Sequence, residues 1–104
     1  MAVKERGKLA YMKGILRSYP KIKAKPLGKR TRNEQRRFEI VSAVLDTVDH
    51  MEYARDKRKF IDMVYFKQSH NIEGAALRIP VGKRTTERWN AQIMSVVEEI
   101  MDLP

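Results

Sequence analysis

The chain has 104 residues, of which 42% are hydrophobic and 34% are charged, and it contains no cysteine. This length corresponds to one domain, or to one domain with an arm, and the hydrophobic content is sufficient for a modest core. The lack of cysteine excludes disulfides, thiolate metal sites and cysteine nucleophiles, and it fits a reducing compartment.

Catalytic and membrane functions find no support in the sequence. The two histidines, His50 and His70, are too few and too isolated for a zinc cage. No nucleophile with a matching base, metal cluster or phosphate-binding glycine loop is present, so we expect no enzymatic activity, no metal and no cofactor. No apolar run reaches the roughly 18 residues that a membrane span requires, and the start, MAVKERGKLAYMKGIL, lacks a signal-peptide core. We therefore expect a cytoplasmic protein without a membrane partner.

Positive charge is concentrated in the first third of the chain. The net charge is +9, but residues up to Arg37 contain thirteen Lys and Arg against two Glu, a net charge of +11. The remaining residues contain nine basic and eleven acidic side chains, a net charge of −2. A polyanion is the natural partner for such an excess. A solvated basic surface, a ribosomal type of RNA contact and an anionic membrane surface remain alternatives.

A first helix is predicted between Lys4 and Tyr19. Its apolar stripe consists of Leu9, Met12, Leu16 and Tyr19. Pro20 is expected to end the helix. Gly7 and Gly14 each cost on the order of 1 kcal/mol relative to alanine, so the helix is expected to depend on docking for its stability.

The segment KIKAKPLGKR, residues 21–30, alternates lysines with small or apolar residues before Pro26 and Gly28. This pattern is typical of an extended basic arm that lies along DNA phosphates, although a disordered connector is equally compatible. The side chains expected to contact phosphates here are Lys21, Lys23, Lys25, Lys29 and Arg30. We therefore divide the chain into an N-terminal helix with a basic arm, residues 1–30, and a helical domain, residues 31–104.

Two further helices are predicted in the middle of the chain. Thr31 and Glu34 form an S/T-x-x-E capping box, which marks a helix start. The apolar face of this helix is Phe38, Ile40, Val41, Val44, Leu45 and Val48. The next helix, from about Tyr53 to Lys67, is expected to bury Phe60, Ile61, Val64 and Tyr65.

Residues 71–101 are expected to form two helices joined by a turn of three or four residues. Asn71 can cap the first helix, Pro80 cannot continue it, and Gly82 permits a close turn. The buried side of the first helix is expected to be Ala75, Ala76 and Ile79. In the second helix the apolar stripe is Thr86, Trp89, Ile93, Val96 and Ile100, and most of the polar residues off it are cationic. Such a helix suits a DNA major groove.

From this pattern we expect a helix-turn-helix that binds double-stranded DNA. The side chains expected to contact bases are Lys83, Arg84, Thr85, Arg88 and Gln92. Lys67 and Arg78 are expected to hold phosphates. Glu87 can either accept a hydrogen bond from cytosine or orient Lys83 or Arg84. A second apolar edge, Met94, Val97 and Met101, can pack on the N-terminal helix or on the second subunit of a homodimer.

These motifs resemble sigma-factor region 4, and more closely the phage late-gene regulators of the RinA and ArpU type. The resemblance covers residues 9–21, in the helix that ends in Tyr19-Pro20, and residues 58–101, where it lies in Tyr65-Phe66, Ala76, Val81-Gly82 and Arg84-Thr85. The chain departs from the pattern at Pro80, where such elements have glycine, and at Gly82, where they have a serine or threonine cap. Arg84, Thr85 and Arg88 are the positions to which the resemblance carries a DNA-contacting role.

The helical periodicity along the chain predicts an all-α fold of four or five helices. The resemblance implies a transcriptional regulator of phage or prophage late genes in the cytoplasm of a bacterial host. It also implies a possible contact with RNA polymerase. Three alternatives remain open: a phage antiterminator that acts on RNA polymerase, a small terminase subunit that recognises viral DNA for packaging, and an interaction module whose basic segment binds acidic protein.

Overall fold

Five α-helices and two short helical turns make up the computed structural model, which describes the backbone of residues 2–102 and the side chains of residues 7–102. The elements in chain order are α1 (Ala2–Ala24), η1 (Leu27–Lys29), α2 (Arg32–Asp49), α3 (Ala54–Ile61), η2 (Asp62–Phe66), α4 (Ile72–Arg78) and α5 (Lys83–Met101). No strand occurs among the described residues, so the prediction of an all-α fold with four or five helices is confirmed.

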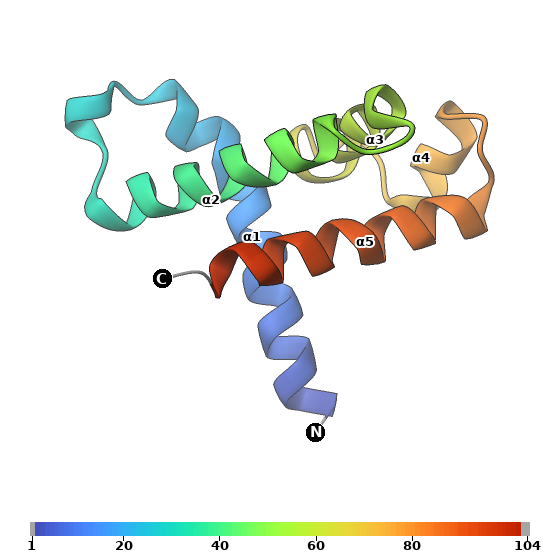
Figure 1. Ribbon diagram of the computed structural model, residues 1–104, viewed down its shortest axis with the longest axis horizontal. Coiled ribbons are helices and arrows are strands. Elements are labelled where there is room, and N and C mark those ends of the chain that lie inside the picture. The colour runs from blue at the N-terminus through green and yellow to red at the C-terminus, as the bar shows by residue number, and fades with distance from the viewer. Residues whose placement is uncertain (1, 103–104) are drawn as a thin grey trace.

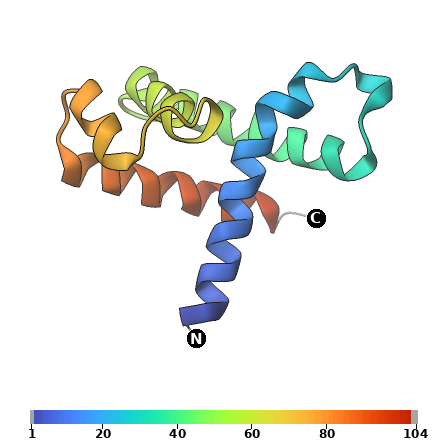
Figure 2. The same cartoon turned by 180° about the vertical axis from the view of Figure 1, so that it is seen from behind.

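The two long helices α2 and α5 lie side by side and run in opposite directions, and α1 crosses both of them (Figure 1). The reverse view shows α1 on the near side of this pair (Figure 2). The short elements α3, η2 and α4 gather at one end of the pair, and the turn η1 lies at the other end. The molecule measures 41 × 35 × 25 Å.

The core is formed by the apolar stripes that the sequence predicts. The side chains with the least exposure include Ile15, Leu16, Val41, Val44, Val48, Phe60, Ile61, Ile93 and Val97. Each side chain of this kind contributes about 1.5–3 kcal/mol on burial. Phe38, Val64 and Ile100 are only half-buried, and Leu9 is exposed, so the stripe of α1 enters the core at Met12.

Helix starts also agree with the sequence. The Thr31 hydroxyl accepts a hydrogen bond from the backbone N–H of Glu34 at 3.1 Å, and the Glu34 carboxylate accepts one from the backbone N–H of Thr31 at 2.9 Å. The Asn71 side chain accepts a hydrogen bond from the backbone N–H of Gly74 at 2.7 Å. Both predicted caps are confirmed, because capping depends only on residues within one helical turn.

The expectation that the first helix ends at Pro20 is wrong, because α1 continues through Pro20 to Ala24. A proline inside a helix removes one backbone hydrogen bond and crowds the preceding turn. Here the following turn is held by packing, since Ile22 is only 3% exposed. The expected extended arm is therefore absent from residues 21–30: Lys21 and Lys23 belong to α1, and the chain then turns through η1 into α2.

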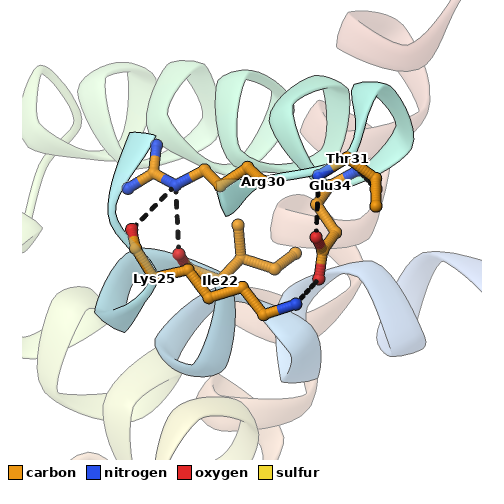
Figure 3. Close-up of polar contacts among 5 residues, drawn as sticks. All are labelled: Ile22, Lys25, Arg30, Thr31 and Glu34. Atoms are coloured by element: carbon orange, nitrogen blue, oxygen red, sulfur yellow. Dashed lines mark hydrogen bonds and ion pairs between the residues drawn. The ribbon is translucent and has the colours of Figure 1, made fainter. Parts of the chain in front are cut away.

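Arg30 stabilises this corner by binding the carboxyl end of α1. Its Nε donates to the carbonyl oxygens of Ile22 at 3.1 Å and Lys25 at 3.2 Å (Figure 3). The last carbonyls of a helix have no partner within it, so a cation at this point is favourable. The Lys25 ammonium completes the corner with an ion pair to Glu34 at 2.6 Å.

The Arg30 guanidinium also covers the end of a column of aromatic rings. It lies 4.2 Å from the centre of the Phe38 ring. Phe38 stacks on Tyr19 with ring centres 5.4 Å apart, and Tyr19 stacks on Phe66 at 5.1 Å. The column joins α2, α1 and η2, so Arg30 contacts both the backbone and the packing of the corner.

The single helix expected between Tyr53 and Lys67 is divided into α3 and η2. The turn η2 is a π-helix, in which the Lys67 N–H donates to the Asp62 carbonyl at 2.7 Å. Within it Tyr65 is 1% exposed, and its hydroxyl donates to the side-chain carbonyl of Asn90 in α5. Burial raises the pKa of Tyr65. This hydrogen bond links η2 to the middle of α5.

Replacing Tyr65 by phenylalanine should lower the free energy of unfolding by about 0.5–1.5 kcal/mol, because the half-buried Asn90 carbonyl loses its donor. Urea titration followed by circular dichroism measures the change. Tyr53→Phe is the matched control, since Tyr53 is exposed. Equal stability of the two variants would contradict a structural role for the Tyr65 hydroxyl.

Arg30→Lys keeps the charge but removes the planar group that donates to the end of α1 and stacks on Phe38. We expect the free energy of unfolding to fall by about 1–3 kcal/mol. Thermal unfolding measures this effect, and Arg32→Lys, at an exposed position two residues away, should leave the midpoint unchanged. A stable Arg30→Lys protein would show that the corner does not depend on the guanidinium.

Candidate nucleic-acid interface

The exposed side of α5 carries Arg84, Arg88 and Gln92, which follow one another at intervals of four residues. Residues four apart in a helix lie above one another on the same side. The opposite side, with Trp89 and Ile93, is buried. The helix therefore presents a row of hydrogen-bond donors to solvent while its other side is fixed in the core.

The short helix α4 packs against α5, and four residues, 79–82, connect the two. Ile79 is buried at the end of α4, and Gly82 has a φ of +83°, which favours glycine. The Thr86 hydroxyl donates to the Lys83 carbonyl at 2.8 Å and so occupies one backbone acceptor in the first turn of α5. These contacts set the position in which the chain enters α5.

Lys83, the first residue of α5, is held by acidic side chains on both helices. Its ammonium lies 2.8 Å from the Glu73 carboxylate in α4 and 4.0 Å from the Glu87 carboxylate in α5. The hydrogen bond to Glu73 raises the pKa of Lys83, and the same bond lowers the pKa of Glu73. Exposed pairs of this kind are weak, so a polyanion can displace the carboxylates.

Arg84 and Arg88 differ from Lys83 in their surroundings. Among the side chains that the structure describes, neither arginine forms an ion pair with a carboxylate. Both are exposed, as is Gln92, whereas Thr85 is half-buried. Of the five side chains expected to contact bases, Lys83 is exposed but paired with carboxylates, whereas the two arginines and Gln92 are exposed and form no ion pair with a described residue.

The side chains expected to contact phosphates lie in two separate places. Lys67 and Arg78 are exposed near α4, and Lys67 forms an ion pair with Asp62 at 3.3 Å. Lys21, Lys23 and Lys29 are exposed at the corner between α1 and α2. The other two predicted contacts of this corner, Lys25 and Arg30, are engaged with Glu34 and with the end of α1.

The corner and the start of α5 lie at opposite ends of the longest axis of the molecule (Figure 1). That axis measures 41 Å. Since a base pair adds about 3.4 Å along DNA, a duplex would need roughly 12 base pairs to reach both places. The structure does not bring the two sets of predicted contacts together in one site.

The sequence analysis did not assign Lys13 and Arg17, which lie on a groove of about 590 Å³ between α1 and the chain that leads into α4. Both residues lie off the apolar stripe of α1, and they are four residues apart. This spacing places them on the same side of the helix, so the sequence does contain a signal for a basic side of α1. The facing wall of the groove comes from residues 68–73, more than fifty positions later. Only the folded chain shows that these two parts meet.

The second apolar edge of α5 is covered within the chain. Met94 and Val97 are buried, and Met101 is half-buried. This edge is therefore covered within one subunit, and a second subunit is not needed to bury it. This packing leaves little apolar surface there for a second copy.

Other kinds of site are not apparent in the described part of the chain. No group of three or more His, Cys, Asp or Glu side chains is arranged to hold a metal ion among those residues. No described helix has the length and apolar character needed to cross a membrane. Comparisons with protein-family models, with curated proteins and with solved structures give no match.

Proposed function

We propose that the chain is a sequence-specific DNA-binding protein that places the exposed side of α5 in the major groove. The observation that carries this proposal is the row of Arg84, Arg88 and Gln92 on a helix whose other side is buried. The net charge of +9 favours a polyanionic partner. Double-stranded DNA combines such a charge with a groove that admits an α-helix.

The spacing of this row suits the edges of a few base pairs. From Arg84 to Gln92 the helix rises about 12 Å, which corresponds to roughly three or four base pairs. Arginine can donate two hydrogen bonds to guanine, and glutamine can form two with adenine. Each such contact supplies about 1–3 kcal/mol of discrimination between bases. In this arrangement α4 and α5 act as a helix-turn-helix.

The position of α4 gives this helix pair its phosphate contacts. Arg78 is exposed in the last turn of α4, and Lys67 is exposed in the segment that precedes α4. Contacts to phosphates fix the orientation of a protein on the duplex but do not select its sequence. Affinity would then come from the cations around α4, and selection from the exposed side of α5.

The biological role that we propose is regulation of phage or prophage late genes. It rests on the resemblance of residues 58–101 to the RinA and ArpU type of regulator, as does a contact with RNA polymerase. The burial of Met94 and Val97 favours a protein that does not dimerise through this edge of α5. A footprint at a late promoter together with a small particle mass in light scattering would support the role; a ring-sized particle bound at a packaging site would contradict it.

Arg84→Ala and Arg88→Ala should each reduce the preference for the bound sequence by about 5- to 150-fold, because each removes a contact worth about 1–3 kcal/mol. The measurement is selection of duplexes from a random pool by the wild-type chain, followed by titration of the selected and scrambled duplexes with each variant. Arg32→Ala removes the same charge at the first residue of α2, a helix that begins at the other end of the molecule, and should keep the preference.

Circular dichroism should show an intact fold in both variants, since the two side chains are exposed. Unchanged sequence preference would show that α5 does not contact bases. If the wild-type chain selects no duplex, sequence-specific DNA binding itself is wrong.

Glu73→Gln should increase affinity for every duplex, because it removes a negative charge beside the start of α5 and releases the Lys83 ammonium. The dependence of affinity on salt should also become steeper, since one more cation is free to neutralise phosphate. The control is Glu99→Gln, an exposed glutamate near the other end of α5. Equal affinities of the two variants would place DNA away from the Glu73–Lys83 pair.

A further inference from the structure

The groove between α1 and the chain leading into α4 has two walls of different chemistry. Lys13 and Arg17 project from α1, and Gln68, Ser69 and His70 line the facing wall. In the part of the chain that the structure describes, neither Lys13 nor Arg17 forms an ion pair with a carboxylate. The two cations lie one helical turn apart, about 6 Å along the axis of α1.

The acidic side chain among those that line the groove is Glu73, and its carboxylate is engaged by the Lys83 ammonium at 2.8 Å. The charge of Glu73 is therefore largely offset, and the groove retains the two positive charges of α1. A concave surface with unpaired cations attracts an anionic ligand. The amide of Gln68 and the hydroxyl of Ser69 are further potential donors to it.

Glu73 also places this groove relative to α5. It is one of the residues that line the groove, and its carboxylate contacts Lys83, the first residue of α5. The lining of the groove extends from α1 to Glu73 in α4, and the Glu73–Lys83 ion pair joins it to the start of α5. The reverse view shows α1 beside the chain that leads into α4 (Figure 2).

We infer that Lys13 and Arg17 bind backbone phosphates of the duplex whose major groove is occupied by α5. This inference rests on the proposed function and adds α1 to the interface. The two side chains neutralise the DNA strand that flanks α5 on the side of α4. Contacts of this kind add affinity for all sequences alike. The cations at the corner of α1 and α2 lie at the far end of the molecule and are not needed for this path.

The test compares two double variants that each remove two positive charges. Lys13→Gln with Arg17→Gln alters the groove, and Lys21→Gln with Lys29→Gln alters the corner. All four side chains are at least partly exposed, so both variants should fold, which circular dichroism and thermal unfolding verify. The ligands are the duplex selected by the wild-type chain and a scrambled duplex, titrated between low and moderate salt.

We expect the groove variant to bind both duplexes more weakly and to reduce the slope of log affinity against log salt by about 1.8, which corresponds to two lost phosphate contacts. Its preference for the selected over the scrambled duplex should stay unchanged. The corner variant should show a smaller change in slope. Ethylation of two particular DNA phosphates should block binding of the wild-type chain. Ethylation of the same two phosphates should not weaken binding of the groove variant further.

An equal change of slope in the two variants would overturn the inference, because it would reflect net charge alone. An unchanged slope in the groove variant would also overturn the inference. If the groove variant in addition lost the ability to bind poly-glutamate, the ligand of the groove would be an acidic peptide instead of DNA. Whichever of these results is obtained, the effect of Arg84→Ala on sequence preference tests the proposed function separately. Failure of the wild-type chain to select any duplex would overturn both.

Discussion

The buried side of α5 is the constraint on which the rest of the structure depends. Its apolar residues, among them Trp89, Ile93 and Val97, form the surface against which α1, α2 and α4 pack. The hydrogen bond from Tyr65 fixes the middle of the same helix through Asn90. A helix held in this way along one side has no freedom to rotate, so the Cα–Cβ bonds on its other side keep a fixed direction. The packing that stabilises the fold thus also places Arg84 and Arg88 on the surface.

The features that the sequence predicted correctly are local ones. The apolar stripes of α2 and α5, the capping box at Thr31 and the cap at Asn71 each depend on residues within one or two helical turns. The exposed position of the α5 arginines follows from the same periodicity, since residues off a buried stripe face solvent. Direct contact of these residues with DNA stays a prediction.

The features that the sequence did not predict depend on contacts between distant residues. The helix α1 continues past Pro20 to a last turn in which Ile22 is buried and its carbonyl accepts from Arg30, eight residues later. The pairing of Lys83 with Glu73 requires α4 to lie against α5, and the groove beside Lys13 requires α1 to meet residues 68–73. The count of positive charges was also misleading, because Lys25 and Arg30 hold the corner together and so are less available to a ligand.

The wide turn η2 determines how the second half of the chain is oriented. An α-helix advances about 100° per residue, and a π turn accommodates one additional residue before it closes its hydrogen bond. With ordinary helical geometry, the residues after Asp62 would point in other directions around the axis, and the Tyr65 hydroxyl would miss Asn90. The one additional residue in this turn thus rotates the direction of the side chains that follow it. A one-residue deletion in this turn would change the direction in which the chain leaves α3 and enters α4, while leaving every residue of α4 and α5 in place.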